Sequence, residues 1–165
     1  MTGGGPRVDV DDRRSATTGA GAAADPGDLA ALLSAVLAAE GVGPGAEVGL
    51  HLVDPAAIAA LNAEHLGGDG PTDVLSFPLD GRDDPGSPPW MVGDVVVCPE
   101  VADAQAAGHA GTAADELRLL VVHGGLHLCG WDHATREDQR AMWDRERQVM
   151  AALGVSPTGD PWAAP

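Results

Sequence analysis

Apolar and polar residues alternate with two distinct periods along this chain, and those periods predict where its strands and helices lie. Residues 48–52 alternate strictly, which is the pattern of a half-buried strand. Residues 74–77 predict a short strand at a sheet edge, because Pro78 follows and cannot donate to a sheet ladder. Residues 91–98 predict the clearest strand, with a nearly continuous apolar run from Val95.

Capping signals between these strands predict the helices. Asp28 is the expected N-cap of a helix over residues 29–40, and Gly41 follows that helix. The Asp-Pro pair at 54–55 opens a second helix. Pro99 opens a third helix, which reaches about residue 107.

Two capping boxes predict the last two helices. The first, residues 112–115, opens a helix that is apolar on most sides and ends at Gly130, so we expect it to be the buried central helix. The second, residues 135–138, opens a helix that reaches about residue 153. The elements together predict the α+β class, with a small mixed sheet of three to four strands packed with about five helices.

The two ends of the chain differ in composition from the segment between them. Residues 1–26 are rich in Gly, Ala and Asp, and Val8 and Val10 are the sizeable apolar side chains within them. Such a segment cannot bury enough surface to offset its ordering entropy, so we expect a disordered tail. The rest is expected to be a single catalytic metallohydrolase domain over residues 27–157 and a flexible C-terminus over residues 158–165.

The charge of the chain limits which kinds of molecule it is expected to bind. The 25 acidic residues outnumber the 9 basic ones, and the formal net charge of −16 disfavours non-specific attraction to phosphate backbones or anionic membranes. Two cysteines are too few for a disulfide framework. No N-terminal apolar run resembles a signal peptide, and no apolar stretch is long enough to span a membrane. We therefore expect a soluble cytoplasmic protein without a membrane partner.

Three of the six histidines lie close together, on and just after the expected central helix. His123 and His127 are four positions apart, so they leave the same helical face. A turn after Gly130 brings His133 back from a third direction. Three neutral imidazoles suit zinc and leave one coordination position open, as in catalytic zinc sites. The alternative, three separately satisfied core histidines, would be costly to desolvate without a shared partner.

The remaining histidines, Cys129 and Asp132 indicate a functional role less clearly. His51, His65 and His109 lie on the polar side of a strand or near helix ends, and we expect them to be structural. Cys129 is expected to pack rather than to act as a fourth ligand. Asp132 has two open roles: it either accepts the second N–H of a ligand imidazole or caps the turn.

The spacing His-x-x-x-His-x-x-Gly-x-x-His also occurs in the metzincin proteases. In those enzymes Glu follows the first His and acts as the general base. Here Gly124 occupies that position, so a metal-bound water would have no adjacent carboxylate to take its proton during peptide hydrolysis. A metzincin-like metalloprotease is therefore an alternative and not the favoured interpretation.

The histidine segment resembles the signature of the YbeY family, whose pattern is His-Gly-x-Leu-His-Leu-x-Gly-Tyr/Trp-Asp-His. From His123 to His133 the chain reads His-Gly-Gly-Leu-His-Leu-Cys-Gly-Trp-Asp-His. Three further blocks resemble the family in the same order: Leu61-Asn62, the Pro-Thr-Asp-Val-Leu-Ser-Phe-Pro run at 71–78, and the Gly-Asp-Val-Val-Val run at 93–97. The resemblance covers about residues 28–155.

The resemblance implies a single-strand-specific, metal-dependent endoribonuclease that acts in ribosomal RNA maturation and ribosome quality control. It implies one zinc ion (Zn2+) per chain, held by His123, His127 and His133, with a metal-bound water as the attacking group and no catalytic protein residue identified. The implied partners are single-stranded RNA and ribosomal RNA, with ribosomal proteins as candidates. A ribosome-assembly binding factor with a mainly structural zinc is a second alternative.

Candidate substrate-binding residues come from the matching edge-strand block. Thr72, Asp73 and Ser76 are expected either to line the substrate groove or to make turn and strand-end hydrogen bonds. Many YbeY proteins carry an Arg shortly after the Leu-Asn block that is thought to meet phosphate, and this chain has Leu66 there. We take Arg118, at the start of the histidine helix, as a further candidate for substrate binding. The arginines that are candidates to replace the missing one are Arg82, Arg118, Arg136 and Arg140.

Overall fold

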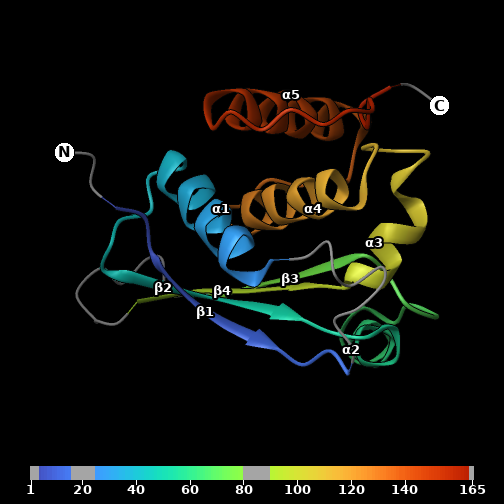
Figure 1. Ribbon diagram of the computed structural model, residues 1–165. Coiled ribbons are helices and arrows are strands. Elements are labelled where there is room, and N and C mark those ends of the chain that lie inside the picture. The colour runs from blue at the N-terminus through green and yellow to red at the C-terminus, as the bar shows by residue number, and fades with distance from the viewer. Residues whose placement is uncertain (1–3, 16–24, 80–89, 164–165) are drawn as a thin grey trace.

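One mixed sheet carries the fold in the computed structural model, which describes residues 4–15, 25–79 and 90–163 (Figure 1). Within this part of the chain the strands are β1 (Arg7–Asp12), β2 (Ala46–Leu52), β3 (Val74–Pro78) and β4 (Trp90–Val97). Their order in the sheet is β1-β2-β4-β3. β1, β2 and β4 run parallel, whereas β3 pairs antiparallel with β4 at the sheet edge. The predicted α+β class, the mixed sheet and the edge strand are confirmed.

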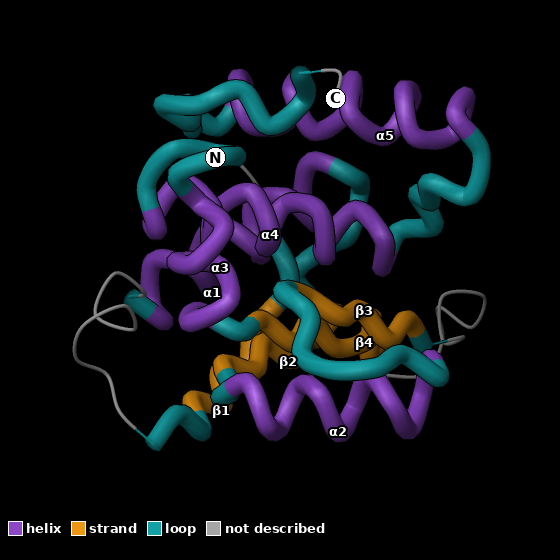
Figure 2. Tube along the Cα trace, turned by 90° about the vertical axis from the view of Figure 1, so that its right-hand side faces the viewer, coloured by secondary structure: helices purple, strands orange, loops and turns teal. Residues whose placement is uncertain are grey.

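Helices cover both faces of this sheet. Those in the described residues are α1 (Pro26–Ala39), α2 (Pro55–Leu66), α3 (Pro99–Ala106), α4 (Ala113–Leu128) and α5 (Arg136–Ala152). Figures 1 and 2 show α1 and α4 on one face of the sheet, α5 on the far side of α4, and α2 alone on the opposite face. None of these helices is long and apolar enough to cross a membrane.

Helix α4 is the buried centre of the fold, as predicted from its apolar sequence. Val121 belongs to a core shared with α1 and the sheet, which includes Leu33 and Val95. Val122 belongs to a second core, in which Met142 of α5 is buried. Full burial of each such side chain is worth roughly 1.5–3 kcal/mol. Burial on two sides holds α4 rigidly, and a residue on α4 is therefore placed precisely.

The capping box predicted for α4 is confirmed, whereas the predicted start of α1 is wrong. The capping box at Thr112 and Asp115 is present, because each side chain bonds the backbone N–H of the other residue. The first helix begins earlier than the predicted Asp28. Asp25 is its N-cap and accepts the Gly27 N–H (2.9 Å), because Pro26 favours the first helical position and draws the start toward the N-terminus.

The prediction of a disordered tail over residues 1–26 is wrong for β1. This strand pairs with β2 over six residues, and Val8 packs against the main core. Ser34 of α1 also donates to the Pro6 carbonyl at 2.8 Å. Composition measures only what a segment can bury alone, whereas a strand that joins an existing sheet edge gains a ladder of backbone hydrogen bonds. The polar loop predicted at 80–89 lies outside the described residues.

The prediction of a flexible C-terminus is wrong for residues 158–162. The Thr158 hydroxyl donates to Asp115 Oδ2 at 2.8 Å, and the Gly159 N–H donates to the Ala110 carbonyl at 2.7 Å. Trp162 donates from its indole nitrogen to Glu146 at 2.9 Å. The segment therefore lies against α4 and α5, which its short polar sequence gives no reason to expect.

Candidate metal centre

Helix α4 carries two of the predicted ligands on one face. Positions four apart on a helix differ by about 40° in direction and about 6 Å in height, and the Nε2 atoms of His123 and His127 lie 3.0 Å apart. Two ligands of a tetrahedral zinc ion, bound at about 2.0–2.1 Å, would lie about 3.3 Å from each other. A small shift of either ring therefore lets both nitrogens bind the same ion.

The third histidine reaches the same point from a turn. Gly130, with φ of 98°, follows the C-cap of α4 and adopts a conformation that a side chain would strain. The ring centroid of His133 then lies 5.0 Å from that of His127 and 5.5 Å from that of His123. One nitrogen from each of the three rings falls within 4.8 Å of the other two. The three histidines could therefore hold one metal ion.

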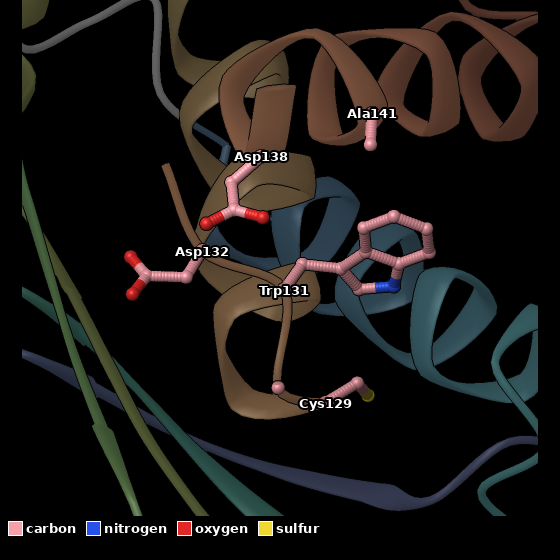
Figure 3. Close-up of a pocket in the computed structure, with 6 residues that line it drawn as sticks. Cys129, Trp131, Asp132, Asp138 and Ala141 are labelled. Carbon is pink, nitrogen blue, oxygen red and sulfur yellow. The ribbon is translucent and has the colours of Figure 1, made fainter. Parts of the chain in front are cut away.

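The turn itself is held by the two residues between Gly130 and His133. Figure 3 shows Trp131 and Asp132 pointing to opposite sides of it. The Trp131 indole N–H donates to Glu40 Oε2 at 3.2 Å, which ties the turn to the end of α1. Asp132 Oδ1 accepts the backbone N–H of His133 at 2.8 Å. Of the two roles that the sequence left open for Asp132, the structure gives it the cap of the turn.

The surroundings favour the protonation state that a metal requires. Burial lowers the pKa of His127, and the neighbouring His123 and His133 imidazoles lower it further. A lowered pKa keeps the ring neutral to a lower pH than an ordinary histidine, and only a neutral ring offers a lone pair to a metal. The donor set of this site therefore fits a metal ion.

A buried carboxylate stands behind His123. Glu146 of α5 is 2% exposed, and its Oε1 atom lies 2.6 Å from Nδ1 of His123. A metal-bound histidine commonly donates its second ring N–H to such a group, which leaves Nε2 free for the metal. Glu146 was not predicted from the sequence. Its signal was an acidic residue on the apolar stripe of a helix, four positions after Met142 and three before Val149, because such a residue must find a partner.

A groove of about 670 Å³ opens beside the histidines, and β3 and the residues before it form one wall. Thr72, Asp73 and Ser76 all line this groove. They also make local bonds, since the Ser76 hydroxyl donates to the Gly124 carbonyl at 3.0 Å and Asp73 Oδ1 accepts the Val74 N–H at 2.8 Å. The structure thus brings these three residues to the metal centre and gives at least two of them a structural bond as well.

Arg118 does not join them, contrary to the sequence prediction. It lies five positions before His123, which is about 140° around the helix. It is not among the described residues that line the groove, and its guanidinium lies 3.8 Å from Asp115 at the start of α4. Leu66 does line the groove, and its side chain is 65% exposed.

Comparison with known proteins assigns the family of this chain. A family model described as "Endoribonuclease YbeY" matches residues 24–154. The chain belongs to the YbeY family. It is 45% identical over 130 residues to Endoribonuclease YbeY of Beutenbergia cavernae, covering 76% of this chain and 87% of that protein. It is 41% identical over 162 residues to Endoribonuclease YbeY of Kineococcus radiotolerans, covering 93% of this chain and 91% of that protein.

A solved structure also resembles the fold of this YbeY protein. The solution structure of TM1509 from Thermotoga maritima superposes with a TM-score of 0.51 at 26% sequence identity. The superposition covers 94% of this chain and 100% of that one.

Packing explains why this YbeY chain has glycine where the metzincin proteases have their general base. A Cβ atom at Gly124 would lie 2.8 Å from Cγ1 of Val95 and 3.2 Å from the Ser76 hydroxyl. Helix α4 therefore rests directly on β4 and β3 at this point, and a glutamate would force the helix off the sheet. The site therefore brings together three histidines that could hold a metal ion but has no room for that carboxylate base.

Proposed function

We propose that this protein is a zinc-dependent endoribonuclease that cleaves single-stranded RNA in ribosomal RNA maturation and ribosome quality control. The observation that carries the proposal is the three-histidine cluster, whose ligand nitrogens fall within 4.8 Å, beside a groove in a chain of the YbeY family. We expect the protein to act in the cytoplasm, with ribosomal RNA as substrate and ribosomal proteins as further partners.

The proposed division of roles follows from the groups around the groove. Zinc held by His123, His127 and His133 would act as a Lewis acid on a phosphate oxygen and make a bound water more acidic. Glu146 would orient His123. The Thr72 hydroxyl, on the groove wall, would meet the RNA backbone by hydrogen bonding.

Two alternatives make different predictions. A metzincin-like protease is disfavoured, because the packing at Gly124 leaves no room for a general base. A ribosome-assembly factor whose zinc is mainly structural draws support from the formal charge of −16 and from Leu66, which presents no positive charge to phosphate in the groove. Such a factor would bind RNA or protein without cleaving RNA.

The deciding experiment compares RNA cleavage by the zinc-loaded protein with cleavage by a His127→Ala variant. We expect the wild type to cut a single-stranded RNA and to leave a duplex of the same sequence intact. We expect the variant to cut neither, because the metal loses a ligand from the rigid helix α4. Cleavage that persists in the variant would show a contaminating nuclease, and intact RNA in both would support the assembly factor.

Replacing Leu66 with arginine is expected to raise the cleavage rate about tenfold. An arginine in the groove offers a bidentate contact to phosphate that strengthens as charge develops on its oxygens in the transition state, and one such donor is worth on the order of 3 kcal/mol. We expect a smaller gain than that energy implies, because position 66 is 65% exposed and its neighbours would not hold the new side chain in place.

Single-turnover rates test this prediction, with Leu66→Met as the matched uncharged control. The zinc content should be the same in both variants, since Leu66 is not one of the predicted metal ligands. An unchanged rate in Leu66→Arg would mean that phosphate does not pass position 66 in the transition state.

A further inference from the structure

Residues 158–162, near the C-terminal end of the described chain, are held by hydrogen bonds next to the metal centre. Two bonds hold its beginning: Thr158 donates to Asp115 at the start of α4, and the Gly159 N–H donates to the Ala110 carbonyl. Pro161 is buried. Trp162, which comes next, therefore reaches α5 from a segment that is already fixed.

Trp162 is held on α5 by two contacts of different kinds. The guanidinium carbon of Arg147 lies 5.0 Å from the centroid of the Trp162 ring, which is within the range of a cation–π contact. The indole N–H of Trp162 donates to Glu146 Oε2 at 2.9 Å. The ring thus has a defined position, and its one polar group meets the carboxylate behind the metal ligand.

The two oxygens of Glu146 have different partners. Oε1 is paired with Nδ1 of His123 at 2.6 Å, and Oε2 accepts the Trp162 N–H. A carboxylate held at one oxygen can still rotate about its last bond, whereas one held at both oxygens has a fixed plane. The three side chains also line one cavity of about 160 Å³ next to the metal centre.

We infer that Trp162 is a positioning residue for metal binding. Its indole N–H fixes the plane of Glu146, and Glu146 in turn holds His123 as the tautomer that presents Nε2 to the metal. The inference rests on the proposed function in so far as the three histidines bind zinc. It assigns a role to the C-terminal segment, which lies beyond the residues 24–154 that the family model matches.

Zinc affinity of the metal-free protein tests this inference directly. The full chain is stripped with a chelator and titrated with zinc against a competing dye. Trp162→Phe keeps an aromatic side chain beside Arg147 and removes the N–H together with the five-membered part of the indole, so we expect it to weaken zinc binding about threefold to tenfold. Glu146→Gln should weaken it about 10–100-fold, as for other outer-sphere partners of metal ligands.

The matched control is Trp143→Phe. Trp143 lies on the same helix as Glu146 and lines the same cavity, but the hydrogen bond to Glu146 comes from Trp162. This control should bind zinc like the wild type. Equal zinc affinity in Trp162→Phe and wild type would overturn the inference, as would an equal loss in Trp143→Phe. A Trp162→Phe protein that unfolds more easily yet binds zinc normally would also overturn it, because the role of the indole would then be structural.

The same samples separate this inference from the proposed function. RNA cleavage by wild type with unchanged zinc affinity in Trp162→Phe would overturn the inference alone. Weaker zinc binding in Trp162→Phe, with no RNA cleavage by any form of the protein, would support the inference and overturn the proposed function.

Discussion

Replacing His123 and His127 together with alanine is expected to abolish zinc binding, which should be about one ion per chain in the wild type. These two residues would supply two of the three ligands from the rigid helix α4, where their Nε2 atoms lie 3.0 Å apart. His133 alone, from an exposed turn, would remain as a single imidazole, which binds zinc too weakly to retain it during purification. Single replacements of any of the three histidines should each lower zinc occupancy sharply. Elemental analysis of the purified protein measures the effect.

Zinc should also stabilise the wild type and leave the double variant unaffected. A ligand that binds only the folded state adds about 2.7 kcal/mol to the unfolding free energy at a concentration of 100 times its Kd. The melting temperature of the wild type should therefore rise with zinc concentration, and that of the double variant should not.

His65→Ala is the cleanest control for the histidine variants. His65 lies partly exposed in α2, edge-on to Phe77 with ring centroids 5.1 Å apart, and is not one of the clustered histidines. His51→Ala and His109→Ala should also retain zinc. His109 contacts the buried Glu116 at 2.8 Å, so its replacement is expected to lower stability without lowering zinc content. Normal zinc content in the His123→Ala/His127→Ala protein would rule out the metal centre described above.

Deleting residues 1–13 is expected to lower the free energy of unfolding by about 2–4 kcal/mol. The deletion removes β1, with its parallel ladder to β2, and each ladder hydrogen bond contributes about 0.5–1.5 kcal/mol. It also removes Val8, which packs against the main core. The edge of β2 would then be unpaired, so the shortened protein should aggregate more readily. Chemical denaturation measures the loss of stability.

Two single replacements in β1 provide the matched comparison. Val8→Ala should cost about 1 kcal/mol, because Val8 contacts the core, whereas Val10→Ala should change the stability by less than about 0.5 kcal/mol, because Val10 is 43% exposed. Equal stability of the full and shortened chains would mean that β1 contributes nothing to folding in solution.

The sequence predicted most of the helices and strands because their signals are local. Both predicted N-caps mark the starts of α4 and α5: the box at 112–115 is complete, and at 135–138 the Thr135 hydroxyl accepts the Asp138 N–H. The edge strand β3 and the helix opened by Pro55 follow from the conformational limits of proline. The start of α1 was misplaced by three residues, since Asp25 and Asp28 are both reasonable caps and only Asp25 accepts a helix N–H.

The ends of the chain show why composition alone was insufficient. Residues 7–12 carry little apolar surface, yet they form β1 because a partner strand 40 residues further on offers unpaired backbone groups, as the pairing of Arg7 with Glu47 shows. The segment 158–162 is short, yet its hydrogen bonds to Asp115 and Glu146 hold it in place. In both segments the stabilising partner is distant in sequence, so no local sequence pattern predicts the contact.

The amino-acid sequence by itself determined which three side chains could hold a metal ion, because the helical period and a glycine-ended turn dictate that His123, His127 and His133 meet. The tertiary structure decided what surrounds them. It brought β3 and Leu66 to one side of the histidines and turned Arg118 away from them, and it placed Glu146 and Trp162 behind His123. The reason is physical: covalent spacing sets the geometry within one helix and its turn, whereas contacts between distant segments depend on how whole helices and strands pack.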